Sequence, residues 1–207
     1  MKRGYGLIWM SAGNSYFKEE IILKLLRFGS KNFNEIIILS PDEPAEHTYL
    51  ALGYEEKNAK RKAKLNSNLL KNRAKRAIEI LKKEGNKTNF KIIEWTNEIN
   101  KQKNYQEELI KIQKLYNSNI SFQKDTKEIT KKVMENKSIT NQNINIDEGV
   151  KYLIKELAFV IVTPIIYNTH HVTYIYHNEW TIFQKLIDGE YDGKQRNNLS
   201  FMLSNIK

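Results

Sequence analysis

The chain has 207 residues, of which 40% are hydrophobic and 28% are charged, and its formal net charge is +10. This length and composition fit one globular domain with a full core, or two very small domains, and exclude a disordered chain. The absence of cysteine excludes disulfides, thiolate nucleophiles and cysteine-ligated metal sites, and the apolar runs are too short to span a bilayer. With no signal-cleavage pattern at the N-terminus, these features predict a protein of the cytoplasm.

The positive charge is concentrated in one segment. Between Lys57 and Lys87 there are 12 basic and 2 acidic residues, so this window accounts for the whole net charge and the rest of the chain is neutral. A concentrated basic segment predicts a polyanionic partner more strongly than a diffuse excess of basic residues does.

The first residues predict a strand, a turn and a helix. The apolar run 6–10 is typical of a buried strand, and the small residues that follow it are typical of a turn. Apolar side chains recur at helical spacing over 15–28, which predicts a helix with Asn14 or Ser15 as its N-cap and Gly29 at its end.

The rest of the chain continues this alternation of strands and helices. We expect strands at 35–39, 89–95 and 172–177, helices at 55–84, 101–137 (broken near 117–119), 147–162 and 180–187, and an asparagine-rich loop at 138–145. The alternation predicts an α/β fold: a single Rossmann-like domain over residues 1–207, with a parallel sheet flanked by helices.

The helix expected at 55–84 divides its side chains between two faces. Alanine and leucine form a stripe that lets the helix approach the sheet, whereas lysine and arginine recur on the other face. Charge runs are usually solvated helix faces, but this segment lacks the acidic residues that pairing at i,i+4 spacing requires. We therefore favour contacts with phosphates, and an RNA backbone recognised by its shape rather than by its bases.

A serine directly follows the first expected strand. In a parallel sheet, ligands bind at the carboxyl ends of the strands, so Ser11 is placed for contact with a ligand. The following helix N-terminus and the Asn14 amide could stabilise an oxyanion there. An ordinary strand-to-helix cap is the alternative. The Gly-x-Ser-x-Gly motif of hydrolases is absent, because Trp9 occupies the first glycine position.

Two further pairs of residues could carry chemistry. Tyr152 and Glu156 are four residues apart on one expected helix, and a hydroxyl beside a carboxylate can hold an ammonium group and move protons. Tyr176 and His177 end the last expected strand. The alternative for Tyr152 and Glu156 is a surface pair. The alternative for Tyr176 is a core tyrosine, and for His177 a histidine whose hydrogen bonds are satisfied. The spacing of the late histidines fits no metal site.

Together, these motifs resemble the tRNA-dependent cyclodipeptide synthases over nearly the whole chain. Those enzymes have a Rossmann fold similar to the catalytic domain of the class I tyrosyl- and tryptophanyl-tRNA synthetases. The combination of Asn14, Tyr176 and His177 is similar to the subfamily with Asn, Tyr and His at these places. The chain departs from the family's usual residues at Tyr5, Trp9, Met10 and Ala158.

The resemblance implies an aminoacyltransferase that makes a cyclodipeptide from two aminoacyl-tRNAs, without ATP and without a cofactor. Ser11 would carry first the aminoacyl group and then the dipeptide as a covalent ester. Tyr152 and Glu156 would hold the α-amino group, supported by Asn14. Tyr176 would relay protons. His177 would lie beside this tyrosine.

The resemblance also implies which residues contact the substrates. Leu7, Trp9 and Phe159 would line the pocket for the first aminoacyl side chain, and Tyr174 and Glu179 would border the second. For tRNA it implies contacts by Arg73, Lys75 and Arg76 of the basic helix, and Lys64 and Lys71, which recur at helical spacing on this helix, are further candidates.

The implied partners are therefore two aminoacyl-tRNAs, with no role for DNA, a membrane or an obligate protein partner. Two other functions remain open. One is a non-catalytic tRNA- or RNA-binding module on a synthetase-like fold. The other is a serine hydrolase, which would leave the basic helix without a role.

Overall fold

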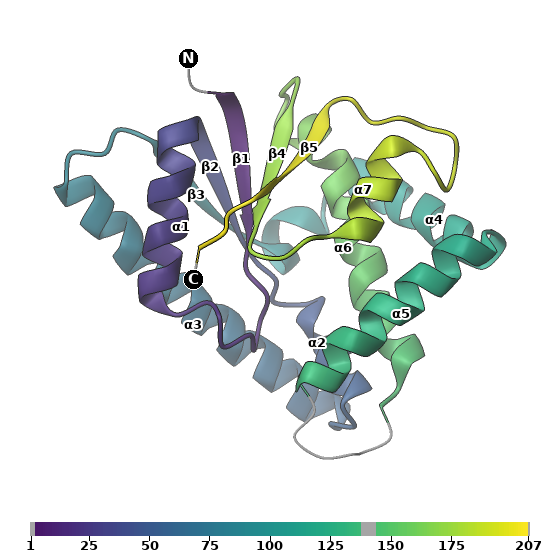
Figure 1. Ribbon diagram of the computed structural model, residues 1–207. Coiled ribbons are helices and arrows are strands. Elements are labelled where there is room, and N and C mark those ends of the chain that lie inside the picture. The colour runs from purple at the N-terminus through teal and green to yellow at the C-terminus, as the bar shows by residue number, and fades with distance from the viewer. Residues whose placement is uncertain (1–2, 138–143, 207) are drawn as a thin grey trace.

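A computed structural model describes residues 3–137 and 144–206. In these ranges five parallel strands form one sheet in the order β3-β2-β1-β4-β5 (Figure 1). The strands are β1 (Arg3–Trp9), β2 (Phe33–Ser40), β3 (Asn89–Glu94), β4 (Val172–Tyr176) and β5 (Leu199–Leu203).

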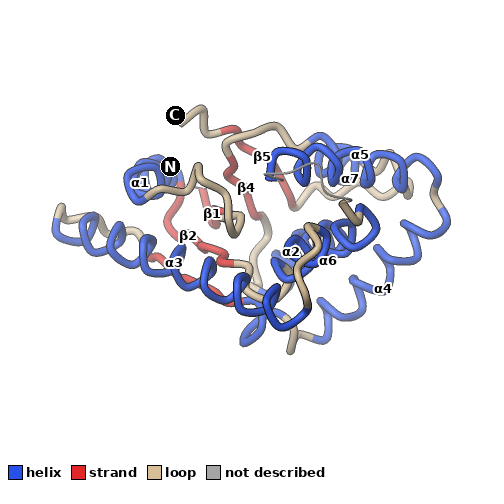
Figure 2. The backbone as a smooth tube through the Cα atoms, turned by 90° about the horizontal axis from the view of Figure 1, so that it is seen from below, coloured by secondary structure: helices blue, strands red, loops and turns tan. Residues whose placement is uncertain are grey.

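Helices cover both faces of this sheet, as Figures 1 and 2 show. One face carries α1 (Glu19–Asn32) and α3 (Glu56–Lys83). The other carries α4 (Lys103–Ser118), α5 (Ile120–Lys137), α6 (Ile146–Ile166) and α7 (Thr181–Asp188). The short helix α2 (Ala45–Ala51) contacts both α3 and α6. None of the helices in the described ranges is long and apolar enough to cross a membrane.

The all-apolar strands are explained by burial on both faces. In β1 and the residue after it, Leu7 and Trp9 belong to the core under α6, whereas Ile8 and Met10 belong to the core under α1 and α3. Successive side chains of a strand point to opposite faces, so a strand covered on both sides must be apolar at every position. The expected α/β fold with a parallel sheet is confirmed.

The strand order places a switch point between β1 and β4. From β1 the chain builds the sheet outward through β2 and β3, and it then returns to add β4 and β5 on the other side of β1. Ligands in doubly wound folds bind where the order reverses in this way, at the carboxyl ends of the strands. Ser11 follows β1 and Tyr176 ends β4, so both lie at this point.

The basic helix α3 has the two faces that its sequence predicts. Ala59, Ala63, Ala74 and Ala77 are fully buried against α1 and the sheet. The helix ends just before Gly85, whose φ of 80° requires the left-handed conformation that glycine adopts without strain. The small alanines bring the helix close to its neighbours and leave the cations on the outer face.

The expected ends of the first helix were wrong. Helix α1 begins at Glu19, and its N-cap is Lys18, which makes no side-chain capping bond, rather than Asn14 or Ser15. Gly29 lies inside the helix, where an added Cβ would stand 2.7 Å from Cδ1 of Ile36. This glycine therefore allows close packing of α1 on β2 and does not end the helix.

Four further boundaries differ from the expectation. Helix α2 and strand β5 were not expected, because both are too short for a periodic pattern to stand out. Trp95 opens a π-helical turn, η1 (Trp95–Ile99), and does not end β3. Helix α6 continues past Pro164 to Ile166. Most of the loop expected at 138–145 lies outside the described residues.

Candidate active site

A cavity of about 650 Å³ lies at the carboxyl ends of β1 and β4. Its walls come from the turn after β1, from α2, α5 and α6, and from the segment after β4. It brings together the residues expected to act on the substrate, although they are up to about 165 positions apart in the chain: Ser11, Asn14, Tyr152, Glu156, Tyr176 and His177.

The centre of the site is the contact between Ser11 and Tyr176. Oγ of Ser11 lies 3.0 Å from the hydroxyl oxygen of Tyr176, which is hydrogen-bond distance. The two strands are paired with Ile8 opposite Ile175, so their ends are necessarily neighbours. Burial raises the pKa of Tyr176 to about 12, so its hydroxyl is protonated at neutral pH and can exchange a proton with the serine.

The turn that carries Ser11 is held in place by its small residues. Gly13 has a φ of 72°, and a Cβ there would lie 2.8 Å from the Tyr49 hydroxyl of α2. Oδ1 of Asn14 accepts a hydrogen bond of 2.9 Å from the backbone N–H of Tyr16. Within the described ranges the amide nitrogen of Asn14 has no hydrogen-bond partner, so it can donate into the cavity.

The expected oxyanion stabilisation by a helix N-terminus is wrong for this structure. It required a helix that starts directly after Ser11, whereas α1 begins only at Glu19. The effect of a helix dipole falls off beyond the first turn. Polar groups around the serine, such as the Asn14 amide and the Tyr176 hydroxyl, are the nearer candidates for this role.

One wall of the cavity is formed by Tyr152 and Glu156 of α6. The Tyr152 hydroxyl accepts a hydrogen bond of 3.3 Å from Nε1 of Trp9, and burial raises the pKa of this tyrosine well above its usual range. The Glu156 side chain is buried, and burial raises its pKa, an effect that the positive charge of Lys137 opposes. A carboxylate in such a setting is a good acceptor for the proton of a bound ammonium group.

His177 lies behind Tyr176 and is held by an aromatic stack. Its ring centroid lies 3.7 Å from that of Tyr16 with an interplanar angle of 14°, and the Tyr16 hydroxyl donates to the backbone oxygen of Ile206 at 2.7 Å. Burial lowers the pKa of His177 to about 4, so the imidazole is neutral at pH 7. Its role beside Tyr176 is thus that of a neutral group.

The residues expected to form the substrate pockets separate into two groups. Trp9, Tyr174 and Glu179 line the cavity. Leu7 and Phe159 do not, because both are fully buried in the core behind it. Their expected place in the pocket wall was therefore wrong.

Large rings fill the space behind the cavity. The Trp9 ring lies 5.9 Å from the Phe159 ring and 5.8 Å from the Trp95 ring. Because Trp9 covers this aromatic cluster, the cavity cannot extend further under the sheet on this side.

Nothing in the sequence indicated that α2 and α5 would form walls of the cavity. Tyr49 of α2 and Met134 and Lys137 of α5 line the cavity, together with other apolar residues of α5. Helix α2 was not expected at all, and lysine is so frequent in the polar stretch 101–137 that nothing there distinguishes Lys137.

The cations of α3 have more partners than the sequence indicated. Lys71 forms an ion pair with Glu94 at the end of β3, and Arg76 pairs with Glu19 of α1 at 2.8 Å. The acidic partners lie on other elements and not on α3 itself. The segment lacks acidic partners at i,i+4 spacing, and Lys71 and Arg76 are instead paired by neighbouring elements.

The other residues expected to contact tRNA differ among themselves. The Arg73 guanidinium donates to the backbone oxygen of Phe17 at 2.9 Å, so it supports the segment between the serine turn and α1. Lys64 and Lys75 are exposed and form no ion pair with any residue that the structure describes. These two lysines are the most accessible of the expected phosphate contacts.

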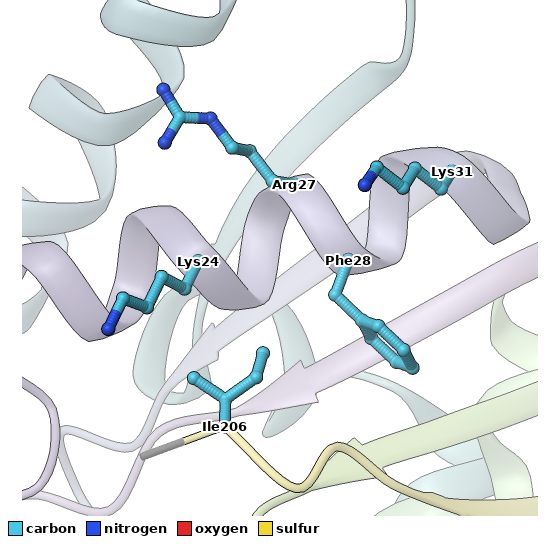
Figure 3. Close-up of a pocket in the computed structure, with 5 residues that line it drawn as sticks. All are labelled: Lys24, Arg27, Phe28, Lys31 and Ile206. Carbon is cyan, nitrogen blue, oxygen red and sulfur yellow. The ribbon is translucent and has the colours of Figure 1, made fainter.

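A second, shallower groove of about 350 Å³ runs along α1 beside the C-terminal segment (Figure 3). It is lined by Lys24, Arg27, Phe28, Lys31 and Ile206. None of these residues was expected from the sequence to act on a substrate, and Arg27 pairs with Glu84 of α3. We therefore assign the site to the cavity around Ser11.

Comparison with known proteins shows the family of the chain. Residues 2–204 match the family model described as cyclodipeptide synthase. A curated relative, the cyclo(L-leucyl-L-leucyl) synthase of Staphylococcus haemolyticus (strain JCSC1435), is 21% identical over 214 residues, which cover 98% of this chain and 87% of the relative.

Solved structures with the same fold include a cyclodipeptide synthase from Bacillus thermoamylovorans, with a TM-score of 0.82 and 22% identity over 97% of this chain and 87% of that chain. A cyclodipeptide synthase from Candidatus Glomeribacter gigasporarum, bound to Phe-tRNAPhe, has a TM-score of 0.60 and 14% identity over 100% and 90% of the two chains. A tyrosyl-tRNA synthetase from Archaeoglobus fulgidus has a TM-score of 0.50 and 13% identity over 92% and 52%. The fold is therefore shared with a class I synthetase.

Proposed function

The chain belongs to the cyclodipeptide synthase family, and from this premise we propose that it joins the aminoacyl groups of two aminoacyl-tRNAs through a covalent ester on Ser11, without ATP. The observation that carries the proposal is the 3.0 Å contact between Oγ of Ser11 and the Tyr176 hydroxyl. This contact lies in a cavity that also presents Tyr152 and Glu156.

In the first step Oγ of Ser11 attacks the ester carbonyl of the first aminoacyl-tRNA. The bond between Oγ and the carbonyl carbon forms, and the bond from that carbon to the ribose oxygen breaks. The serine proton passes through the Tyr176 hydroxyl to the departing ribose oxygen, a transfer that the geometry at this pair supports. One ester replaces another, so the step requires no ATP.

In the second step the α-amino group of the acyl-enzyme attacks the carbonyl of the second aminoacyl-tRNA. Tyr152 and Glu156 hold this amino group, and the Glu156 carboxylate accepts the proton that the ammonium must lose. The amide bond forms, the bond from the carbonyl carbon to the second ribose oxygen breaks, and the second proton that the nitrogen loses goes to that oxygen. The second tRNA leaves, and a dipeptidyl ester remains on Ser11. Formation of an amide from an ester is downhill, so this step also proceeds without ATP.

In the last step the free amine of the dipeptide attacks its own ester carbonyl. The diketopiperazine ring closes, the bond to Oγ breaks, and the amine proton returns through Tyr176 to Ser11. The neutral His177 imidazole beside Tyr176 adds no charge to this proton path. The covalent ester lets one cavity receive two large substrates in succession.

The basic face of α3 holds the tRNA body in this proposal. Lys64 and Lys75 are exposed cations of this face that form no ion pair with a described residue, and Arg73, Lys71 and Arg76 lie on the same helix. The solved relative bound to Phe-tRNAPhe supports an aminoacyl-tRNA as the substrate. Charged tRNA as the substrate places the reaction in the cytoplasm.

Two other functions fit these residues less well. A module that only binds tRNA has no need for a serine, two tyrosines and a buried carboxylate around one cavity. A serine hydrolase would leave the basic face of α3 without a role. Membership of a family of synthases also argues against both.

The proposal is tested by mass spectrometry of the intact protein after incubation with charged tRNA. We expect the wild type to gain the mass of one aminoacyl residue on Ser11, and Ser11→Ala to gain none and to make no cyclodipeptide. Ser15→Ala, which removes the neighbouring hydroxyl, is the matched control and keeps the adduct. Cyclodipeptide formation by Ser11→Ala would contradict the covalent route.

A further inference from the structure

The cavity contains a cation that the three steps of the proposed reaction do not use. Lys137 is the last residue of α5, and its Nζ lies in the cavity, where it donates a hydrogen bond of 3.1 Å to the backbone oxygen of Ala12. We propose that Lys137 is a positioning residue of the acyl-transfer site, which fixes the turn that carries Ser11 and supplies a positive charge to the cavity that Glu156 lines. This inference rests on the proposed function.

The contact with Ala12 joins two elements that are distant in the chain. Ala12 directly follows Ser11, so its carbonyl and Oγ of Ser11 belong to the same turn. The turn is supported on one side by Tyr49 of α2, which lies close to Gly13, and Lys137 adds a second support from α5. A nucleophile held from two sides keeps its geometry when the substrate enters, which is what a catalytic group requires.

The second part of the role follows from the surroundings of Glu156. The titratable groups that face this carboxyl are Tyr152 on its own helix, Tyr174 and Tyr176 on β4, and Lys137 on α5. Burial raises the pKa of each tyrosine, so all three are neutral at pH 7. Among the described residues, Lys137 therefore supplies the positive charge that acts on Glu156.

A buried carboxyl group without a positive charge nearby takes up a proton. A protonated Glu156 could neither attract the α-ammonium group of the substrate nor accept its proton. The charge of Lys137 opposes this protonation. Conversely, burial lowers the pKa of Lys137 to about 8, which Glu156 opposes, so the lysine is mostly charged at pH 7.

The position of Lys137 leaves the carboxylate available to the substrate. No hydrogen bond or ion pair joins Lys137 to Glu156, and the ammonium group is instead held at the Ala12 carbonyl. Both carboxylate oxygens thus remain without a protein partner in the part of the chain that the structure describes. A lysine in direct contact with Glu156 would compete with the substrate amino group, whereas a lysine held at Ala12 supports the charge from a distance.

The test compares the pH dependence of Ser11 ester formation in the wild type and in Lys137→Met. The rate is measured from pH 6 to 9 in single turnover with charged tRNA. Loss of the positive charge raises the pKa of Glu156 further. We therefore expect the acidic limb of the pH–rate profile, where the rate falls as the pH is lowered, to move up by about one pH unit in Lys137→Met. At a pH on this limb the rate then falls by about tenfold. Lys137→Arg keeps the charge and is expected to keep the limb in place.

Two controls separate the charge effect from a structural effect. Lys132→Met removes an exposed cation from the same helix and is expected to leave the limb unchanged. Lys137→Gln retains a donor for Ala12 without the charge, and it is expected to show the same shift as Lys137→Met even if the latter folds poorly.

The possible failures are distinguishable. A wild type that forms no ester on Ser11 would overturn the proposed function and this inference with it. An ester on the wild type, with an unchanged acidic limb in Lys137→Met and Lys137→Gln, would overturn the inference alone. A uniformly slower rate without a shift would overturn the proposed effect on Glu156 and leave Lys137 only as a support of the Ser11 turn.

Discussion

The cavity at the ends of β1 and β4 and the outer face of α3 use charge in opposite ways. In the cavity, Glu156 and Lys137 are withdrawn from water, and burial shifts both pKa values. On α3, Lys64 and Lys75 stand in solvent, where each charge is screened. A single unit of charge therefore has a large effect in the cavity and a small one on the helix.

This difference indicates what each region can do. The cavity can control the position of one proton or one amino group, because each of its groups acts in surroundings that screen it poorly. The helix can only add many weak attractions, which suits a long polyanion such as tRNA and makes binding sensitive to salt. Changes to single atoms of the cavity should therefore have larger effects than changes to the collective charge of α3 or to a charge at the cavity rim.

The largest effect is expected for Tyr176→Phe, which removes the hydroxyl that contacts Ser11 and leaves the ring. Loss of a proton relay costs about 10²- to 10⁴-fold, so ester formation on Ser11 should slow by at least about 100-fold. The rate is measured by rapid quench and mass spectrometry. Tyr105→Phe is the matched control, because it removes a buried tyrosine hydroxyl outside the cavity. Equal rates in Tyr176→Phe and the wild type would remove Tyr176 from the mechanism.

The next effect concerns the size of the cavity. Trp9→Leu opens the space in front of Phe159 and removes the bond from Nε1 to Tyr152, so larger first aminoacyl groups should enter. We expect a broader set of cyclodipeptides and a loss of about 2 kcal/mol in the free energy of unfolding. The set of cyclodipeptides is measured by mass spectrometry of an expression culture, and the free energy of unfolding by denaturant titration.

Trp95→Leu is the control for this prediction. Trp95 is fully buried behind Trp9 and does not line the cavity, so its loss should destabilise the fold by a similar amount without changing the products. A changed product set in Trp95→Leu, or an unchanged one in Trp9→Leu, would show that Trp9 is not the wall of the pocket.

The sequence predicted the parts of the fold that repeat a pattern. The apolar strands and the alanine stripe of α3 were recognisable because each is periodic over many residues. The start of α1 was not, because Asn14 makes an Asx turn to Tyr16 in a loop and not at a helix cap. Asparagine favours both structures, and only the tertiary packing decides between them.

The candidate site was predictable to a similar degree. Ser11 and Tyr176 could be placed together because both end parallel strands, and the resemblance to a family supplied their order. Lys137 could not be found, since its contact with Ala12 depends on how α5 crosses the cavity. Phe159 was misplaced because neither spacing nor family resemblance shows that Trp9 covers it.

A smaller effect is expected on tRNA binding when cations of α3 are removed together. In Lys64→Ala/Lys75→Ala, tRNA affinity should fall severalfold, and the slope of log Kd against log salt should change by about 0.7 to 0.9 for each phosphate that the helix no longer neutralises. Binding of charged tRNA is measured on the Ser11→Ala protein, so that no turnover occurs. Lys71→Ala should change the slope less, because this lysine already pairs with Glu94. A larger change in Lys71→Ala would mean that tRNA displaces the ion pair.

The smallest effect is expected for Glu179→Ala, at the rim of the cavity. Glu179 lines the cavity but is exposed at its rim, so its carboxylate is screened and can favour a polar or cationic second aminoacyl group by about 0.5 kcal/mol. This energy corresponds to a change of about twofold in the ratio of products, which comparison of cyclodipeptides at low and high salt can detect. Glu190→Ala removes an exposed carboxylate outside the cavity and serves as the control. An unchanged product ratio in Glu179→Ala would mean that the buried walls of the cavity select the second aminoacyl group. A charge at the rim that contributes to this selection must respond to salt.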